Sequence, residues 1–277
     1  MADLSADIVG TEFPAGEWEY TDRDVMLYAL GVGAKELEFI YEGDLKVLPT
    51  FAVIPTFPAM GGLFGIADNI NPAMILHGEQ SITLHRLIPV AGTVSTKGRV
   101  ASVYDKGASG AVINIETETR DSKGELLFNS LFGIFARGAG GFGGDRGPKA
   151  GNLPPNRPAD KVVAETTAPN QNAIYRLSGD RNPLHIDPDF AAMAGYERPI
   201  LHGLCSYGFV GRAILREYCG NDPARFKHYG VRFSKEVYPG DTLVTEFWEE
   251  GEGKLILRVS TQDGRVVLSN CVAEYVP

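Results

Sequence analysis

A glycine- and proline-rich stretch lies near the middle of the chain, where residues 138–158 read GAGGFGGDRGPKAGNLPPNRP. Glycine favours turns, and proline blocks both helix interiors and central strands, so no regular element can run through this stretch. We therefore expect a linker over residues 138–160. It separates an N-terminal half, residues 1–137, from a C-terminal half, residues 161–277.

The two halves share an outline that suggests a duplicated unit. Each opens with a short helical pattern that ends at a glycine, and Thr21 and Thr167 are the expected N-caps. Each then has a strand, a proline and glycine, and more strand. Tyr28 in the first helix and Tyr175 in the second precede that proline by similar distances, as a duplication requires.

Long alternating patterns finish each half: AVINIETETRD and ELLFNSLFGIFAR in the first, KLILRVSTQD and RVVLSNCVAEYV in the second. Alternation with a period of two predicts antiparallel strands that bury one face. One longer helix is expected over residues 205–217, where Phe209, Val210, Ala213 and Ile214 recur at helical spacing. A sheet wrapped around a helix, twice over, is an α+β architecture.

Composition removes several classes of function. The formal net charge is -9, whereas a protein that binds nucleic acid through its phosphates is normally basic. No window approaches the roughly 18 consecutive apolar residues of a spanning helix, so we expect no membrane insertion. Three widely spaced cysteines fit neither a zinc site nor a disulfide framework.

Two further patterns are weak signals. Residues 138–143 match GxGxxG, but a dinucleotide loop must open a helix, and the following sequence is hostile to one. The linker interpretation is therefore preferred. The five histidines show no HxH or HExxH spacing, so we expect no metal unless the fold brings them together.

The most informative segment is YRLSGDRNPLHID, residues 175–187. Gly179 permits a sharp turn and Pro183 stiffens the backbone, which can aim Asp180 and His185 at one point. A carboxylate and an imidazole together can activate water, because one accepts its proton while the other orients it and returns a proton. An ordinary polar turn, with Asp180 capping a helix and His185 exposed, explains the residues equally well.

A second segment, Pro199 to Leu204, places His202 and Gly203 just before the predicted helix. The first N–H groups of a helix have no partner inside it and can stabilise a developing oxyanion. A plain helix start is the alternative. The same tetrapeptide, ILHG, occurs at residues 75–78, where it leads into a strand.

The segment YRLSGDRNPLHIDPDFAAMAG resembles the hydratase 2 motif of the MaoC-like dehydratases, the (R)-specific enoyl-CoA hydratases. The resemblance extends over almost the whole chain, through DVMLYALGVGA, FIYEGDLKVLPTFAVI, DKG, GGFGG and RFSKEVYPGDTL. It implies a double hot-dog fold in which only the C-terminal half keeps the catalytic loop. It also implies reversible hydration of trans-2-enoyl-CoA to (3R)-3-hydroxyacyl-CoA in fatty-acid beta-oxidation, with no cofactor beyond the coenzyme A of the substrate.

The resemblance also implies roles for single residues. Asp180 and His185 would activate the water, Asn182 would support it, and the Gly203 N–H would bind the thioester oxygen. Glu42, from the first half, matches a further residue associated with activity. Positions that match substrate-binding or supporting residues are Tyr28, His77, Gly78, Lys106, Tyr175, Arg181, Pro183, Leu184, Asp187, His202 and Phe233.

Several expectations follow from the family. Hot-dog sheets leave open edges, so we expect a homodimer, and a longer protein could join this unit to a dehydrogenase domain. No targeting signal is seen in this chain, so the enzyme would be cytoplasmic if bacterial and peroxisomal if eukaryotic. Residues 57–65, small and flexible, predict room for medium to long acyl chains. The alternatives are a dehydratase of a specialised pathway, with steroid side-chain or acyl-carrier-protein substrates, and a non-catalytic acyl-CoA-binding subunit.

Overall fold

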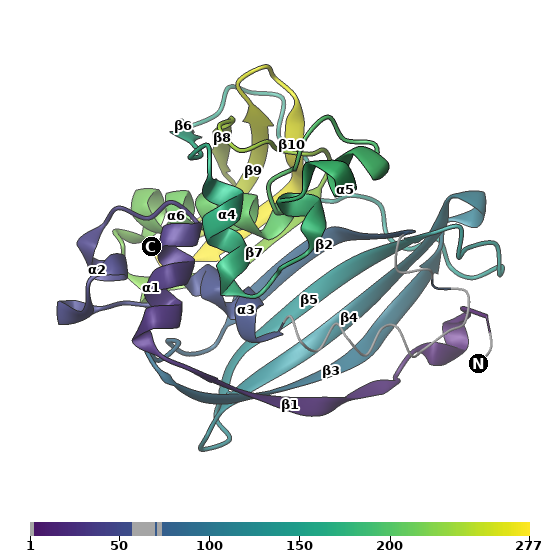
Figure 1. Ribbon diagram of the computed structural model, residues 1–277, viewed down its shortest axis with the longest axis horizontal. Coiled ribbons are helices and arrows are strands. Elements are labelled where there is room, and N and C mark those ends of the chain that lie inside the picture. The colour runs from purple at the N-terminus through teal and green to yellow at the C-terminus, as the bar shows by residue number, and fades with distance from the viewer. Residues whose placement is uncertain (1–2, 57–69, 71–73) are drawn as a thin grey trace.

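The computed structural model describes residues 3–56, 70 and 74–277. Its described strands form one antiparallel sheet in the order β1-β3-β4-β5-β2-β7-β10-β9-β8-β6, as Figure 1 shows. The strands are β1 (Glu12–Tyr20), β2 (Ile75–Leu84), β3 (Gly92–Asp105), β4 (Gly110–Asp121), β5 (Leu126–Arg137), β6 (Lys161–Thr166), β7 (Phe226–Phe233), β8 (Thr242–Glu249), β9 (Lys254–Thr261) and β10 (Val266–Tyr275).

The strand order of one half recurs in the other. The N-terminal strands run β1-β3-β4-β5-β2, and the C-terminal strands run β6-β8-β9-β10-β7 in the same relative sequence. The two sets join where β2 pairs with β7, with Gln80 opposite Val231. The predicted α+β class is confirmed, and the junction places residues from both halves side by side at the centre of one sheet.

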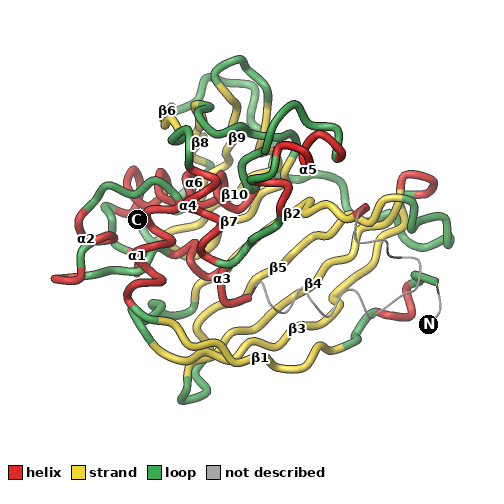
Figure 2. The backbone as a smooth tube through the Cα atoms, in the orientation of Figure 1, coloured by secondary structure: helices red, strands yellow, loops and turns green. Residues whose placement is uncertain are grey.

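The described α-helices gather around the C-terminal half of the sheet, while β1 and β3 to β5 extend away from them (Figure 2). They are α1 (Asp22–Gly31), α2 (Leu37–Ile40), α3 (Val53–Thr56), α4 (Gln171–Tyr175), α5 (Pro188–Met193) and α6 (Gly203–Cys219). No helix in the described ranges is long and apolar enough to cross a membrane.

Helix α6 is the predicted long helix, and it begins and ends slightly beyond the predicted bounds. Every residue from Leu204 to Leu215 is buried, so α6 lies within the main core rather than on its surface. Gly208 allows this, because a Cβ there would lie 2.4 Å from Val32 Cγ1. Gly220, with φ of +61°, then ends the helix in the left-handed conformation that glycine favours.

One of the two predicted N-caps is wrong. Thr21 caps α1 through a capping box with Asp24. Thr167 does not cap a helix, because its hydroxyl oxygen accepts the Gly240 N–H at 2.9 Å while its O–H donates to the Asp241 carbonyl oxygen at 3.0 Å. The helix begins later, after Asn170, and is shorter than the pattern predicts.

Arg212 of α6 ties the two halves together. Its buried guanidinium contacts both carboxylate oxygens of Glu36, at 3.0 and 3.1 Å, and donates to the Val32 carbonyl oxygen at 3.1 Å. Removing one member of a buried ion pair leaves the other without compensation, which is more damaging than losing an exposed pair.

We expect Arg212→Ala to lower the free energy of unfolding by about 2–4 kcal/mol, because Glu36 and the Val32 carbonyl both lose their partner. Arg216→Ala is the matched control. That residue lies one turn further along α6, and its ion pairs with Glu165 and Glu217 are half-exposed. It should change stability by less than about 1 kcal/mol. Equal losses in urea unfolding of the two variants would contradict this assignment.

Candidate active site

A cavity of about 1360 Å³ lies where the two halves of the sheet meet. Strands β2, β4 and β5 line it from the N-terminal half, and residues 180–206 with β7 line it from the C-terminal half. The predicted site residues that it brings together are His77, Gly78, Lys106, Asp180, Asn182, Leu184, His185, His202, Gly203 and Phe233. Segments distant in sequence therefore converge on one space.

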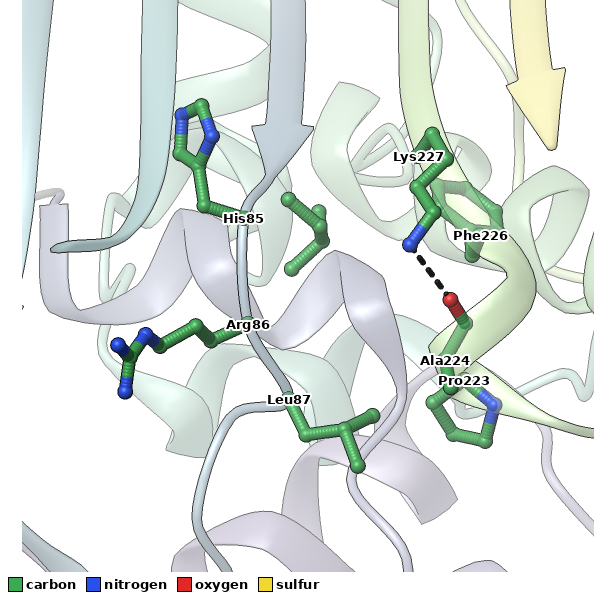
Figure 3. Close-up of a pocket in the computed structure, with 8 residues that line it drawn as sticks. His85, Arg86, Leu87, Pro223, Ala224, Phe226 and Lys227 are labelled. Carbon is green, nitrogen blue, oxygen red and sulfur yellow. Dashed lines mark hydrogen bonds between the residues drawn. The ribbon is translucent and has the colours of Figure 1, made fainter. Parts of the chain in front are cut away.

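A second, smaller hollow of about 160 Å³ lies near the end of β2 (Figure 3). Its basic residues are His85, Arg86 and Lys227, and the Lys227 ammonium donates to the Ala224 carbonyl oxygen at 2.7 Å. No carboxylate lines this hollow beside the imidazole. The predicted pair of Asp180 and His185 lines the larger cavity instead.

Turns in the backbone shape the loop that carries Asp180 and His185. After α4 and a 3₁₀ turn over Arg176–Ser178, Gly179 adopts a φ of +142°. Asn182 then caps a second 3₁₀ turn over Pro183–His185, because its side-chain oxygen accepts the Leu184 N–H at 3.0 Å. The Asn182 N–H in turn donates to the Asp180 carboxylate at 3.1 Å. Glycine and proline thus act where the sequence predicts.

His185 is held in one orientation by two contacts. Its Nδ1–H donates to the Ile200 carbonyl oxygen at 2.9 Å, which leaves Nε2 with a free lone pair. The Asn172 side-chain amide donates to the His185 carbonyl oxygen at 2.5 Å. The ring is only 8% exposed, so the alternative of an exposed histidine on a polar turn is wrong.

His202 contacts both Asp180 and His185. Its Nε2–H donates to the Asp180 carbonyl oxygen at 3.0 Å, and its ring stacks on that of His185 with centroids 3.7 Å apart. The Tyr175 ring packs against its other side, at 4.9 Å between centroids. His202 therefore fixes both members of the predicted acid–base pair.

The fold does bring possible metal ligands together. The Asp180 carboxylate and ring nitrogens of His185 and His202 lie within 4.8 Å of one another. The two imidazole planes, however, are stacked at 27°. Because the lone pairs lie in those nearly parallel planes, they do not converge on one ion.

Burial keeps both imidazoles neutral. It lowers the pKa of His185, against the opposing effects of the Ile200 carbonyl and the Asp180 carboxylate. It lowers the pKa of His202 to about 3, assisted by the charge of neighbouring His185. A neutral His185 can accept a proton from water at neutral pH.

We expect the acid limb of the kcat/KM profile to lie below pH 6.5, the ordinary histidine value. With His185 as the base, activity requires its neutral imidazole, and the lowered pKa keeps that ring neutral further into acid. The stability of the folded protein also falls as the pH is lowered. Unfolded His202 takes up a proton near pH 6.5, whereas the folded residue does so near about 3. The unfolding free energy is therefore full above pH 6.5 and falls by up to about 1.4 kcal/mol per unit below it.

Circular dichroism at each pH separates the loss of activity caused by protonation of His185 from the loss caused by unfolding. An acid limb centred at or above pH 6.5 in fully folded protein would contradict the lowered pKa of His185.

Gly203 presents a free amide to the cavity. It is the first residue of α6, and its N–H has no acceptor among the described residues. The ring of Phe233 lies over it, since a Cβ on Gly203 would meet Phe233 Cε1 at 3.0 Å. An unpaired helix N-terminal N–H beside Asp180 and His185 is the arrangement that an oxyanion site requires.

Other predicted site residues lie outside the cavity lining. Asp187 caps α5 by accepting the Asp189 and Phe190 N–H groups, and Glu42 is exposed on a 3₁₀ turn. Residues Arg181 and Pro183 are exposed and do not line the cavity, and the buried Tyr28 and Tyr175 pack behind it. The roles that the resemblance implies for these residues stay predictions.

The sequence analysis did not predict two residues of the site, Asn172 and Ser206. Asn172 holds the backbone of His185, and it precedes Tyr175 by three residues on α4, a spacing that puts both on one helix face. Ser206 also lines the cavity, one turn after Gly203. Its buried hydroxyl has no partner among the described residues. The sequence signal for Ser206 was its helical spacing from Gly203, which places both residues on one face of α6.

Comparisons with known proteins agree with this geometry. Residues 18–138 match the MFE-2 hydratase 2 N-terminal domain family, and residues 150–270 match the MaoC-like domain family. The chain is 45% identical to the peroxisomal multifunctional enzyme type 2 of Mus musculus over 97% of its own length. It spans only 38% of that longer protein.

Shorter relatives match over their whole length. The chain is 43% identical to the probable enoyl-CoA hydratase 2 of Dictyostelium discoideum, covering 94% of this chain and 92% of that protein. The crystal structure of a MaoC-like dehydratase from Phytophthora capsici superposes with a TM-score of 0.92 at 34% identity, covering 99% and 98% of the two chains. The hot-dog fold expected from the sequence is confirmed, and the chain belongs to the MaoC-like hydratase 2 family.

Proposed function

We propose that this chain catalyses the reversible addition of water to a trans-2-enoyl-CoA, giving a (3R)-3-hydroxyacyl-CoA. One observation carries the proposal: Asp180 and the neutral His185 share a cavity with the free N–H of Gly203. The named relatives support it, because they include enoyl-CoA hydratases of similar length.

The geometry accounts for activation of water. Two hydrogen bonds of about 2.8 Å made by one water near the tetrahedral angle place their partners about 4.6 Å apart. The Asp180 carboxylate and the His185 ring lie within 4.8 Å, a span that one water bridges. One of the pair takes a proton as the water oxygen adds to C3 and then passes that same proton to C2, while the other accepts the second hydrogen bond of the water and orients it.

The Gly203 N–H completes the reaction. As the water adds, negative charge moves onto the thioester oxygen, and a hydrogen bond from the start of α6 stabilises that charge. Because helix and loop are both fixed by buried contacts, the donor needs no rearrangement during the reaction. We propose that no metal or redox cofactor takes part, since carboxylate, imidazole and amide supply every proton transfer and the charge stabilisation.

Hydration of crotonyl-CoA and decenoyl-CoA tests the proposal. We expect turnover of both, retained in the presence of a chelator, with a product oxidised only by a dehydrogenase specific for the (3R) isomer. Medium to long chains should have the higher kcat/KM, although residues 57–65, on which that preference was predicted, lie outside the described residues. A non-catalytic acyl-CoA-binding subunit would turn over neither thioester, and a specialised dehydratase would prefer its own acyl group.

Assembly and location follow from the relatives and the sheet. Relatives in the mouse and in Neurospora crassa are named as peroxisomal enzymes of several functions, and the latter joins a hydratase to a dehydrogenase and an epimerase. We propose a peroxisomal location for a eukaryotic source, and a fusion of this kind where the protein is longer. We also propose a homodimer, because β1 and β6 are unpaired edges within the described sheet.

A further inference from the structure

The glycine-rich segment after β5 folds around one carboxylate. Asp105, the last residue of β3, accepts the N–H groups of Gly107 at 2.7 Å, Gly141 at 2.8 Å and Gly143 at 2.7 Å. The side chain is only 6% exposed. The Gly141 N–H, followed by that of Gly107, lowers the pKa of Asp105 below its ordinary value, so the group stays ionised.

The glycines are needed for this arrangement. A Cβ on Gly140 would lie 2.0 Å from the Gly110 carbonyl oxygen, and Gly141 and Gly143 have φ values of +93° and +81°. Residues 144–160, directly after Gly143, form no helix, as the sequence predicts. The GxGxxG match is therefore explained by the binding of an internal carboxylate and not of a nucleotide.

A second contact fastens the far end of the same segment. The Asn270 side-chain oxygen accepts the Gly151 N–H at 3.1 Å and the Asn152 N–H at 2.9 Å. Between the two fastenings, Gly147 packs on the ring of Tyr104. Residues 144–150 are thus held at both ends against β3 and β10.

The held segment forms one wall of the active-site cavity. Pro148, Lys149 and Ala150 line it together with Asp180 and His185. Other cations on the same cavity are Lys106, Arg137 and Lys235, and with Lys149 we call these four the basic rim. Among the described residues, no carboxylate lies within ion-pair distance of any of them, whereas Arg232 nearby is paired with Glu79.

Unpaired cations facing one cavity repel one another and favour an anionic ligand. The acyl group and the thioester carry no charge, so the anionic part of the proposed substrate is the phosphates of coenzyme A. We propose that Asp105 is a positioning residue for these phosphates: by binding the glycine-rich segment, it holds Lys149 within the basic rim. The inference rests on the proposed function and adds a role for Asp105 and Lys149.

The test compares two Asp→Asn variants on two substrates. Asp105→Asn removes the charge that gathers the three N–H groups. Asp145→Asn is the matched control, because Asp145 is exposed in the same segment and, among the described residues, its carboxylate accepts only the Gly147 N–H, while its backbone bond from Asp105 is unaffected by the change. The substrates are crotonyl-CoA and its truncated N-acetylcysteamine thioester, which has the same reacting atoms and no phosphates.

For Asp105→Asn, we expect KM for crotonyl-CoA to rise about tenfold with kcat unchanged, the scale of one charge-assisted contact. Its kcat/KM for the truncated thioester should match that of the wild type. Asp145→Asn should stay within about twofold on both substrates. Equal losses on both substrates, or no change in KM for crotonyl-CoA, would overturn the proposal. A wild type inactive on both substrates would instead contradict the proposed function.

Lys149→Gln supplies a test that does not depend on the folding of Asp105→Asn. It should raise KM for crotonyl-CoA by at least as much as Asp105→Asn does, about tenfold, and leave kcat/KM for the truncated thioester unchanged. Combined with Asp105→Asn it should add little, because both changes remove the same contact. Full additivity of the two effects would show that Asp105 does not act through Lys149 and would overturn the inference.

Discussion

Asp180→Asn and His185→Gln should each lower kcat for enoyl-CoA hydration by at least about a hundredfold, the usual effect of removing a general acid or base. Each change keeps the size of the side chain but removes its ability to exchange a proton with water. The Ile200 carbonyl and Asn172 hold His185 in one orientation in the wild type. KM should change much less than kcat.

Two controls show whether the loss is chemical. Asp189→Asn makes the same exchange in the first turn of α5, and His85→Gln makes it at the exposed end of β2. Both should keep kcat within about threefold of the wild type, since neither residue lines the cavity. Circular dichroism and thermal unfolding confirm that each variant is folded. Near-normal turnover by folded Asp180→Asn and His185→Gln would contradict the assignment of these two residues as the acid–base pair.

The parts of the fold that depend on local pattern could be predicted. Alternation of apolar residues predicts the strands, and helical spacing predicts α6. The catalytic loop is equally local, because Gly179 and Pro183 fix a short backbone whose side chains face one point. The pattern leaves open whether His185 is exposed or buried, and the structure shows that it is buried.

The features that sequence reasoning missed depend on contacts between distant segments. Thr167 has the sequence context of an N-cap, but its hydroxyl is bonded to the backbone of Gly240 and Asp241. The glycines after β5 look like a simple linker, although they bind Asp105. Asn172 has no motif of its own, and its function appears only when the loop folds back over α4. Such pairings follow from the tertiary fold, which no single segment encodes.

Gly203→Pro should lower kcat about a hundredfold to a thousandfold, the range seen when one oxyanion donor is removed. Proline lacks the N–H but is favoured as the first residue of a helix, so α6 can still form. The residue before a proline must be extended, and His202 already has φ of -59° and ψ of 135°. The substitution therefore removes the donor while the backbone on both sides keeps its conformation.

Gly203→Ala is the matched variant, because it adds a Cβ against Phe233 but retains the N–H. Steric displacement of the thioester by that Cβ raises KM in both variants, whereas loss of a bond made mainly in the transition state lowers kcat in the proline variant alone. The comparison of kcat between proline and alanine at residue 203 therefore removes the effect of the Cβ and leaves the effect of replacing the N–H hydrogen by the proline Cδ. If the two variants have the same kcat, the Gly203 N–H is not the oxyanion donor, and the free N–H of Leu204 becomes the next group to test.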